Sequence, residues 1–365
     1  MTLLDRYLGW AVFRAFLLVA IGLTALFSLL DFIEQLSLIG YGRYQLRDAL
    51  SSALLTAPDR LLQIAPIAML LGSLIGLGGL ARYSELTAWR SFGVSEARMM
   101  GAVVKLCLPV ILGLFLIAQF VVPPAQQKAQ REQAAALGDA LPGLSNGGFW
   151  AQKNGVFLNV QNYTGRHTLR GVEIFAFNPD GTLQSHIRAE TARPLPDGEW
   201  QLTGVERDAV SNGQIETDHP ASLAWRPFLS DKQLQLLAIP PETMPPLALF
   251  AYVHELKRQH QEALIYEQSF WNMVAVPVSL IGMVLIAAPF VFGGTQRSGH
   301  AGWQTVTGAV IGIGFLLIQE ITGYAGLLMA VNPAISALTP PLLLVSLGAW
   351  LLARGHNRLQ TLFSG

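Results

Sequence analysis

The sequence has few of the residues on which soluble enzymes depend. Only 13% of its 365 residues are charged and the formal net charge is zero, whereas a soluble domain carries about twice that charged share. Cys107 is the only cysteine, which excludes an internal disulfide and a multi-cysteine metal site. A net charge of zero provides no basic surface for nucleic acid. With a mean hydropathy of +0.40, these shortages predict a membrane protein.

Nucleotide, metal and nucleophile motifs are also missing. None of the lysines follows a glycine, so the chain has no Walker A loop, and no histidine pair has the spacing of a metalloprotease site. The Gly143–Gly147 segment matches GxSxG, but Pro142 before it and Gly148 after it favour a loop. We therefore expect no catalytic residue, metal or cofactor. If ATP drives this protein, another subunit hydrolyses it.

Long apolar runs dominate what is present. A run needs about 20 residues to cross a bilayer, and the runs here predict a span near each of 15–30, 61–81, 99–122, 270–292, 303–323 and 334–353. Residues 1–14, with Arg6 and Arg14 beside Trp10, predict an interfacial helix leading into an uncleaved anchor. Asp31 and Glu34 are expected to end the first span.

Between the third and fourth spans the composition changes. Val156, Leu158 and Val160 alternate with Phe157 and Asn159, which predicts a strand with an apolar face. Further alternating runs and Pro/Gly turns predict an all-β sandwich or jelly-roll domain, followed by a helix over 245–268. The expected organisation is a membrane half at 1–123, the β domain with its connecting helix at 124–265, and a second membrane half at 266–365.

The short loops predict the orientation. Arginines gather on the side that holds both termini and the loop at 82–98, and such residues mark the cytoplasmic side. The β domain would then face outward, which in a bacterium is the periplasm.

The loop at 82–95 is amphipathic. Leu86, Trp89 and Phe92 recur every third residue, Ser84 is a candidate N-cap, and Gly93 a candidate stop. With Glu85 at its start, this helix either docks into a cytoplasmic partner or is an ordinary interfacial loop.

Other features leave two interpretations open. Gly72 and Gly76, like Gly308 and Gly312, permit close helix approach, either at an interface or inside the bundle. Lys128 and Arg131 share a helical face beyond the third span, where they are candidate phosphate contacts or a solvated helix end.

The chain resembles the permease subunits of the lipopolysaccharide-export ABC transporter, the LptF/LptG family, over nearly its whole length. The resemblance rests on Leu4-Asp-Arg-Tyr-Leu-Gly9, on Gly76-Leu-Gly-Gly-Leu-Ala81 running into Ser84-Glu-Leu86, and on Phe290-Val-Phe-Gly293. It implies six helices with a periplasmic β-jellyroll inserted between helices three and four. It also implies a multi-pass protein of the bacterial inner membrane that passes lipopolysaccharide toward the outer membrane.

The resemblance further implies partners and site residues. The partners are an LptF-like paralogous permease, an LptB-like ATPase dimer, and LptC-like and LptA-like bridge proteins. The helix around Glu85, with Ser84, Leu86, Trp89 and Phe92, would be the ATPase-coupling element. Family members place basic residues against lipid A phosphates near the outer ends of spans one and three. Here Ser37 and Leu38 stand where a basic pair is expected, so Lys128, Arg131 and Arg43 are the candidates.

Val156, Leu158 and Val160 are the candidate lining of a lipid groove in the β domain. Two other roles remain open: a permease that relays ATP-driven motion without carrying lipid, and a scaffold that only anchors the β domain.

Overall fold

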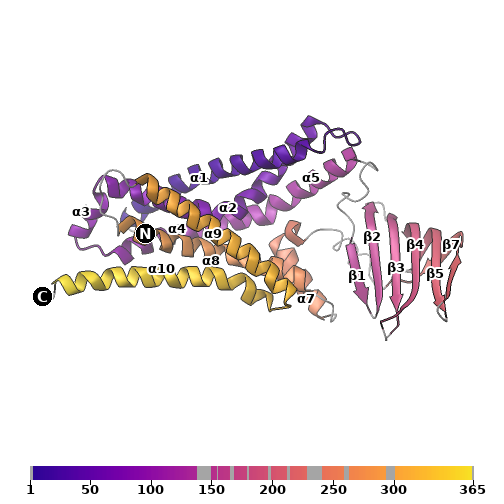
Figure 1. Cartoon of the computed structure of the whole chain (residues 1–365). Coiled ribbons are helices and arrows are strands. Elements are labelled where there is room, and N and C mark those ends of the chain that lie inside the picture. Colours follow the sequence, from indigo (N-terminus) through magenta and orange to yellow (C-terminus); the bar gives the residue numbers. More distant parts are fainter. Residues whose placement is uncertain are drawn as a thin grey trace. The chain divides into compact units, whose positions relative to one another are not determined.

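The computed structural model describes residues 3–137, 149–153, 155–164, 168–178, 181–195, 199–211, 214–227, 241–258, 263–292 and 301–363. The chain divides into two compact units. One holds residues 1–34, 53–126 and 245–365, and the other holds residues 35–52 and 127–244. Figure 1 shows the helices and the sheet with their labels.

Within the described residues, six helical stretches are long and apolar enough to cross a membrane. They lie in α1 (Leu3–Leu36), α2 (Leu46–Arg82), α4 (Glu96–Phe120) continued by α5 (Val122–Leu137), α8 (Leu264–Phe292), α9 (Ala301–Leu328) and α10 (Pro333–Phe363). The short α3 (Glu85–Ser91) lies between α2 and α4 in the chain, and α7 (Pro246–Arg258) precedes α8. The predicted six spans are confirmed.

Three helix boundaries differ from the prediction. The expected interfacial helix and first span are one unbroken helix, which continues past Asp31 and Glu34 to Leu36. The second helix begins at Leu46, well before its apolar run. The helix expected over 245–268 is instead α7 and the first turn of α8, and Phe250 is exposed beside the buried Val253. Hydropathy locates the part of a helix that lies in lipid, but backbone hydrogen bonding extends beyond it.

The helix α2 is the most enclosed span. In its most apolar 18-residue window 78% of residues are buried, against 11% in α1 and 22% in α9. The two outer helices therefore present long apolar faces, with Leu18 and Ile21 on α1 and Val310 and Ile321 on α9 all more than half exposed.

Glycines at the helix contacts let α1 and α9 pack closely against α2. A Cβ added at Gly72 would lie 2.6 Å from Phe16 Cα, and one at Gly76 would lie 2.8 Å from Val12 Cα, so α1 contacts α2 backbone to backbone. Gly308 and Gly312 of α9 face Leu74 and Ile67 of α2. These four glycines therefore serve packing inside this chain, which decides between the two interpretations left open by the sequence.

The β unit contains one antiparallel sheet of seven described strands. They are β1 (Phe149–Lys153), β2 (Val156–Thr164), β3 (Thr168–Phe177), β4 (Leu183–Pro194), β5 (Trp200–Ser211), β6 (Gln214–Asp218) and β7 (Ser222–Trp225). Neighbouring strands pair in chain order, and β6 and β7 share the far edge of β5. Figure 1 shows this meander as a row of arrows. The predicted β domain between the third and fourth spans is confirmed.

One face of the sheet forms an apolar core. Its buried residues are Leu158, Val160, Leu169, Val172, Ile174, Ile187, Ala189, Ala192, Trp200, Leu202 and Val205. The opposite face carries charged side chains in register, where Arg188 pairs with Glu173 on β3 and Glu206 on β5. The GxSxG segment at 143–147 lies outside the described residues.

Candidate functional site

The short helix α3 is held to the bundle by part of its apolar face. Leu86 is only 3% exposed and belongs to the helical core, and Trp89 packs against that core. Phe92, which ends the helix, is 82% exposed. The three residues therefore do not act as one buried stripe. Leu86 and Trp89 anchor α3 to the helical core of this chain, and the aromatic ring of Phe92 is exposed.

Ser84 occupies the N-cap position of α3 as predicted, but its side chain does not cap the helix. Its backbone is left-handed, with φ 60° and ψ 12°, and its side chain makes no cap hydrogen bond. Its N–H instead donates to the carbonyl of Ala81 near the end of α2. Only Tyr83 and Ser84 separate the two helices, so the chain must reverse sharply, and a left-handed residue after a helix provides that turn.

Gly93 ends α3 as predicted. It has φ +82°, and its N–H donates to the carbonyl of Arg90. Arg90 also forms an ion pair with Glu96 at 3.2 Å, which ties the end of α3 to the start of α4. Both ends of α3 are thus fixed by local contacts.

Glu85 at the start of α3 is held by a residue from the first turns of α1. The Tyr7 hydroxyl donates to Glu85 Oε2 at 2.6 Å. Tyr7 is 47% exposed and Glu85 is half-buried, so the pair lies at the surface of the bundle. Sequence reasoning missed this contact, although Tyr7 belongs to the Leu4–Gly9 motif.

A buried carboxylate lies close by in the same motif. The Asp5 side chain is 1% exposed and contacts Arg98 Nη1 at 2.8 Å and Lys105 Nζ at 3.2 Å, both from α4. A carboxylate removed from water needs such partners. Since 93 residues separate Asp5 from Arg98, no local pattern predicts the cluster.

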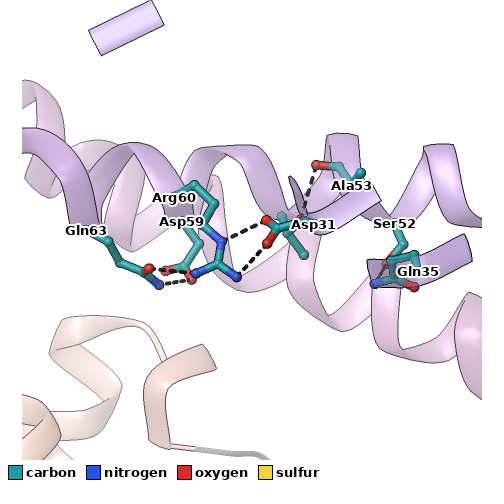
Figure 2. A network of polar contacts seen from close by, with 8 residues as sticks. Asp31, Gln35, Ser52, Ala53, Asp59, Arg60 and Gln63 are labelled. Atoms are coloured by element: carbon teal, nitrogen blue, oxygen red, sulfur yellow. Dashed lines mark hydrogen bonds and ion pairs between the residues drawn. The ribbon is translucent and has the colours of Figure 1, made fainter. Parts of the chain in front are cut away.

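A second polar network lies in the membrane unit where α1 nears its end (Figure 2). Arg60 of α2 donates from Nε to Asp31 Oδ2 at 2.7 Å and from Nη2 to Asp31 Oδ1 at 2.8 Å. Arg60 Nη1 also donates to Gln63, which in turn donates to Asp59. The helix therefore continues past Asp31, because a bidentate partner offsets the cost of keeping its charge in the helix pair.

The three candidate phosphate contacts all lie in the other unit. Lys128 Nζ lies 3.7 Å from Glu132, whose carboxylate also accepts a hydrogen bond from Ser51 at 2.8 Å. The Arg43 N–H donates to the carbonyl of Ala136 at 2.6 Å, at the C-terminal end of α5. Arg131 is exposed on the same helix. The loop that carries Arg43 is thus placed against α5, which carries the other two cations.

The candidate groove residues lie on the apolar face of the sheet. Leu158 and Val160 are 0% exposed, and Val156 packs against their cluster while keeping partial exposure. Phe157 pairs in register with Phe175, and Asn159 with Glu173, on the opposite face. Leu158 and Val160 are therefore core residues of this chain, and Val156 is the member of the set that remains accessible.

In the described part of the chain no group of three or more His, Cys, Asp or Glu side chains has a metal-binding arrangement. The described residues provide a short helix with an exposed aromatic ring, a set of exposed cations and an apolar sheet face.

The chain is similar to known proteins over nearly its whole length. The family profile "Lipopolysaccharide export system permease LptF/LptG" matches residues 6–354. The lipopolysaccharide export system permease protein LptG of Escherichia coli K12 is 31% identical over 353 residues, which cover 96% of this chain and 98% of that protein. LptG of Haemophilus influenzae is 31% identical over 356 residues, covering 97% and 99%. With its six spans and its β domain between the third and the fourth, the chain belongs to the LptF/LptG family of lipopolysaccharide export permeases.

Proposed function

We propose that this protein is the LptG-type permease subunit of an ATP-driven transporter. It would extract lipopolysaccharide from the outer leaflet of the bacterial inner membrane and pass it to a periplasmic bridge. The observation that carries this proposal is the family match over residues 6–354, which includes both the membrane helices and the β sheet. The arginine-rich side with α3 would be cytoplasmic, and the β domain periplasmic.

The energetics of lipid transfer favour such an architecture. Each CH₂ group moved from lipid into water costs about 0.8 kcal/mol. A lipid with several long acyl chains therefore cannot be released into water and must move between apolar surfaces. The chain provides exposed apolar faces on α1 and α9 and an apolar sheet face centred on Leu158 and Val160.

The polar ends of the lipid need a second kind of contact. The exposed cations described above are Lys128, Arg131 and Arg43. Charge-assisted hydrogen bonds to phosphate are among the strong polar contacts. We infer that they hold the lipid A phosphates while the acyl chains follow the apolar faces.

ATP hydrolysis belongs to a partner in this proposal, because the chain has no Walker A loop. The partner would be an LptB-like ATPase dimer that receives α3 through Glu85 and the exposed Phe92. An LptF-like paralogous permease would complete the membrane part, and LptC-like and LptA-like proteins would accept the lipid.

The test is purification of the intact complex from membranes with mass spectrometry of its proteins and lipids. Glu85→Lys should reduce the amount of co-purifying ATPase and stop lipid release. Glu216→Lys makes the same charge reversal at an exposed position of β6 and should change neither. If Glu85→Lys retains its ATPase and releases lipid at the normal rate, the coupling role is wrong.

The alternative role as a motion-relaying permease gives a different result. It predicts normal ATPase co-purification without lipopolysaccharide bound to the spans or the sheet. Recovery of lipopolysaccharide crosslinked to both parts of the wild-type chain would exclude it.

A further inference from the structure

We propose that Tyr7 is a positioning residue for energy coupling, which orients Glu85 and links the coupling helix α3 to α1. This inference rests on the proposed role of Glu85. It adds the first turns of α1 to the coupling element, so that movement of α3 reaches a membrane-spanning helix that is not its neighbour in the chain.

The first observation is the hydrogen bond itself. The Tyr7 hydroxyl donates to Glu85 Oε2 at 2.6 Å across 78 residues of sequence. The helix α3 has only seven residues and no side-chain N-cap, so nothing at Ser84 restrains its first turn through a side chain. A donor from α1 therefore fixes the carboxylate that the partner would meet.

The second observation is that Tyr7 stands on an anchored part of α1. Two positions earlier, the buried Asp5 carboxylate joins Arg98 and Lys105 of α4. One helical turn after Asp5, a Cβ on Gly9 would lie 3.8 Å from Leu106 of α4. The start of α1 is thus held on α4 while Tyr7 reaches α3, and α4 follows α3 directly in the chain.

The third observation is the continuity of α1. It runs from Leu3 to Leu36 without a proline, whereas α2 contains Pro58 and Pro66 and α4 contains Pro109. At 1.5 Å per residue its length is about 51 Å, more than the apolar thickness of a bilayer. A shift of α3 that pulls on Tyr7 would therefore act on one rigid helix, which near its other end is joined to α2 through Asp31 and Arg60 (Figure 2).

Tyr7→Phe is the sharpest test because it removes only the hydroxyl. Lipid release per ATP hydrolysed should be measured in the complete complex, together with the amount of co-purifying ATPase. We expect release per ATP to fall roughly threefold to tenfold, the effect of losing one solvent-accessible hydrogen bond of ordinary net strength. The amount of ATPase should remain normal, because α3 keeps its anchors at Leu86 and Trp89.

Tyr83→Phe is the matched control. Tyr83 lies next to α3 and is 77% exposed, so removing its hydroxyl should leave release per ATP unchanged. A double-mutant cycle with Glu85 distinguishes a positioning role of Tyr7 from a merely structural one. If Tyr7 acts through Glu85, Tyr7→Phe should have no further effect in the Glu85→Ala background.

The failures of the two proposals are distinguishable. Normal release in Tyr7→Phe, combined with lost release in Glu85→Lys, would overturn the positioning role and leave the coupling role intact. Equal losses of release in the Glu85-containing and Glu85→Ala backgrounds would also overturn it. Loss of the ATPase from Tyr7→Phe would instead make Tyr7 a docking contact, and the positioning role would again be wrong.

Discussion

Asp31 of α1 and Arg60 of α2 form a bidentate ion pair, with Nε 2.7 Å from one carboxylate oxygen and Nη2 2.8 Å from the other. The Asp31 side chain is 14% exposed and that of Arg60 36%. The ion pair joins two helices that elsewhere pack closely at Gly72 and Gly76. It explains how α1 continues past an acidic residue.

Breaking this pair should destabilise the membrane unit. Asp31→Ala leaves the Arg60 guanidinium without its main acceptor, and we expect the free energy of unfolding to fall by about 1–3 kcal/mol, between the values for exposed and buried pairs. Denaturant titration of the detergent-solubilised protein measures this. The charge exchange Asp31→Arg with Arg60→Asp should recover part of the loss. If it is no better than Asp31→Ala, the charges do not stabilise the helix pair.

Close contact at Gly72 gives a steric prediction. A methyl group there would lie 2.6 Å from Phe16 Cα and 2.7 Å from Phe16 N, and backbone cannot move aside as a flexible side chain can. Gly72→Ala should therefore separate α1 from α2 and lower stability by about 1–3 kcal/mol. Gly79→Ala in the same helix meets no heavy atom within 4 Å and should be neutral or slightly stabilising. Equal stability of the two variants would contradict the packing described.

Local patterns predicted much of this architecture and failed where distant residues meet. Hydropathy located the six spans, and period-two alternation placed Leu158 and Val160 on the apolar face of a strand. The left-handed turn at Gly93 was also predictable, because glycine tolerates positive φ. Ser84 was placed correctly at the start of α3, but the short connection between α2 and α3 requires a left-handed turn there, and its side chain does not cap the helix.

The polar contacts of the candidate site were not predictable in this way. Asp5 meets Lys105, and Tyr7 meets Glu85, only after α1, α3 and α4 have packed. In the sequence these residues lie far apart, with Asp5 and Tyr7 near the N-terminus, Glu85 in the loop and Lys105 in the third span. The motif around Leu4–Gly9 was visible as a family resemblance, but the partners of its side chains depend on tertiary structure.

Phosphate recognition predicts a charge-dependent loss of lipid contact. Replacing Lys128 and Arg131 by Glu should reduce lipopolysaccharide crosslinking to neighbouring positions of α5, because each charge-assisted contact contributes about 1.5–3 kcal/mol. ATP hydrolysis by the partner should continue. Because Lys128 also pairs with Glu132, a Glu132→Gln variant tests whether loss of that pair alone has the same effect. Undiminished crosslinking would mean that these cations are only a solvated helix end.

Acid should weaken one edge of the sheet. The Thr217 hydroxyl donates to Asp208 Oδ1 at 2.7 Å, and this bond, with His186 nearby, holds the pKa of the Asp208 carboxyl below its ordinary 3.8. A lowered folded-state pKa stabilises the fold above the ordinary value, and the stabilisation is lost as pH falls through the folded-state value. Thr217→Val should therefore reduce this loss, so that the hydrogen-exchange protection factors of the β5 and β6 amides fall less as the pH is lowered below 3.8. An unchanged acid response would show that Asp208 does not control this edge.

The apolar face of the sheet gives the most direct test of lipid passage. Leu158 and Val160 are fully buried, so a bulky photo-crosslinker at either position would disrupt the core. Val156 lies on the same face and keeps partial exposure, which makes it the better probe. A crosslinker at Val156 should capture lipopolysaccharide when ATP is supplied, whereas one at Asn159, in register with Glu173 on the polar face, should capture little. Equal capture at both positions would exclude a face-specific path. Capture confined to the membrane spans would mean that the lipid bypasses this sheet, and that the β domain serves the complex in a different way.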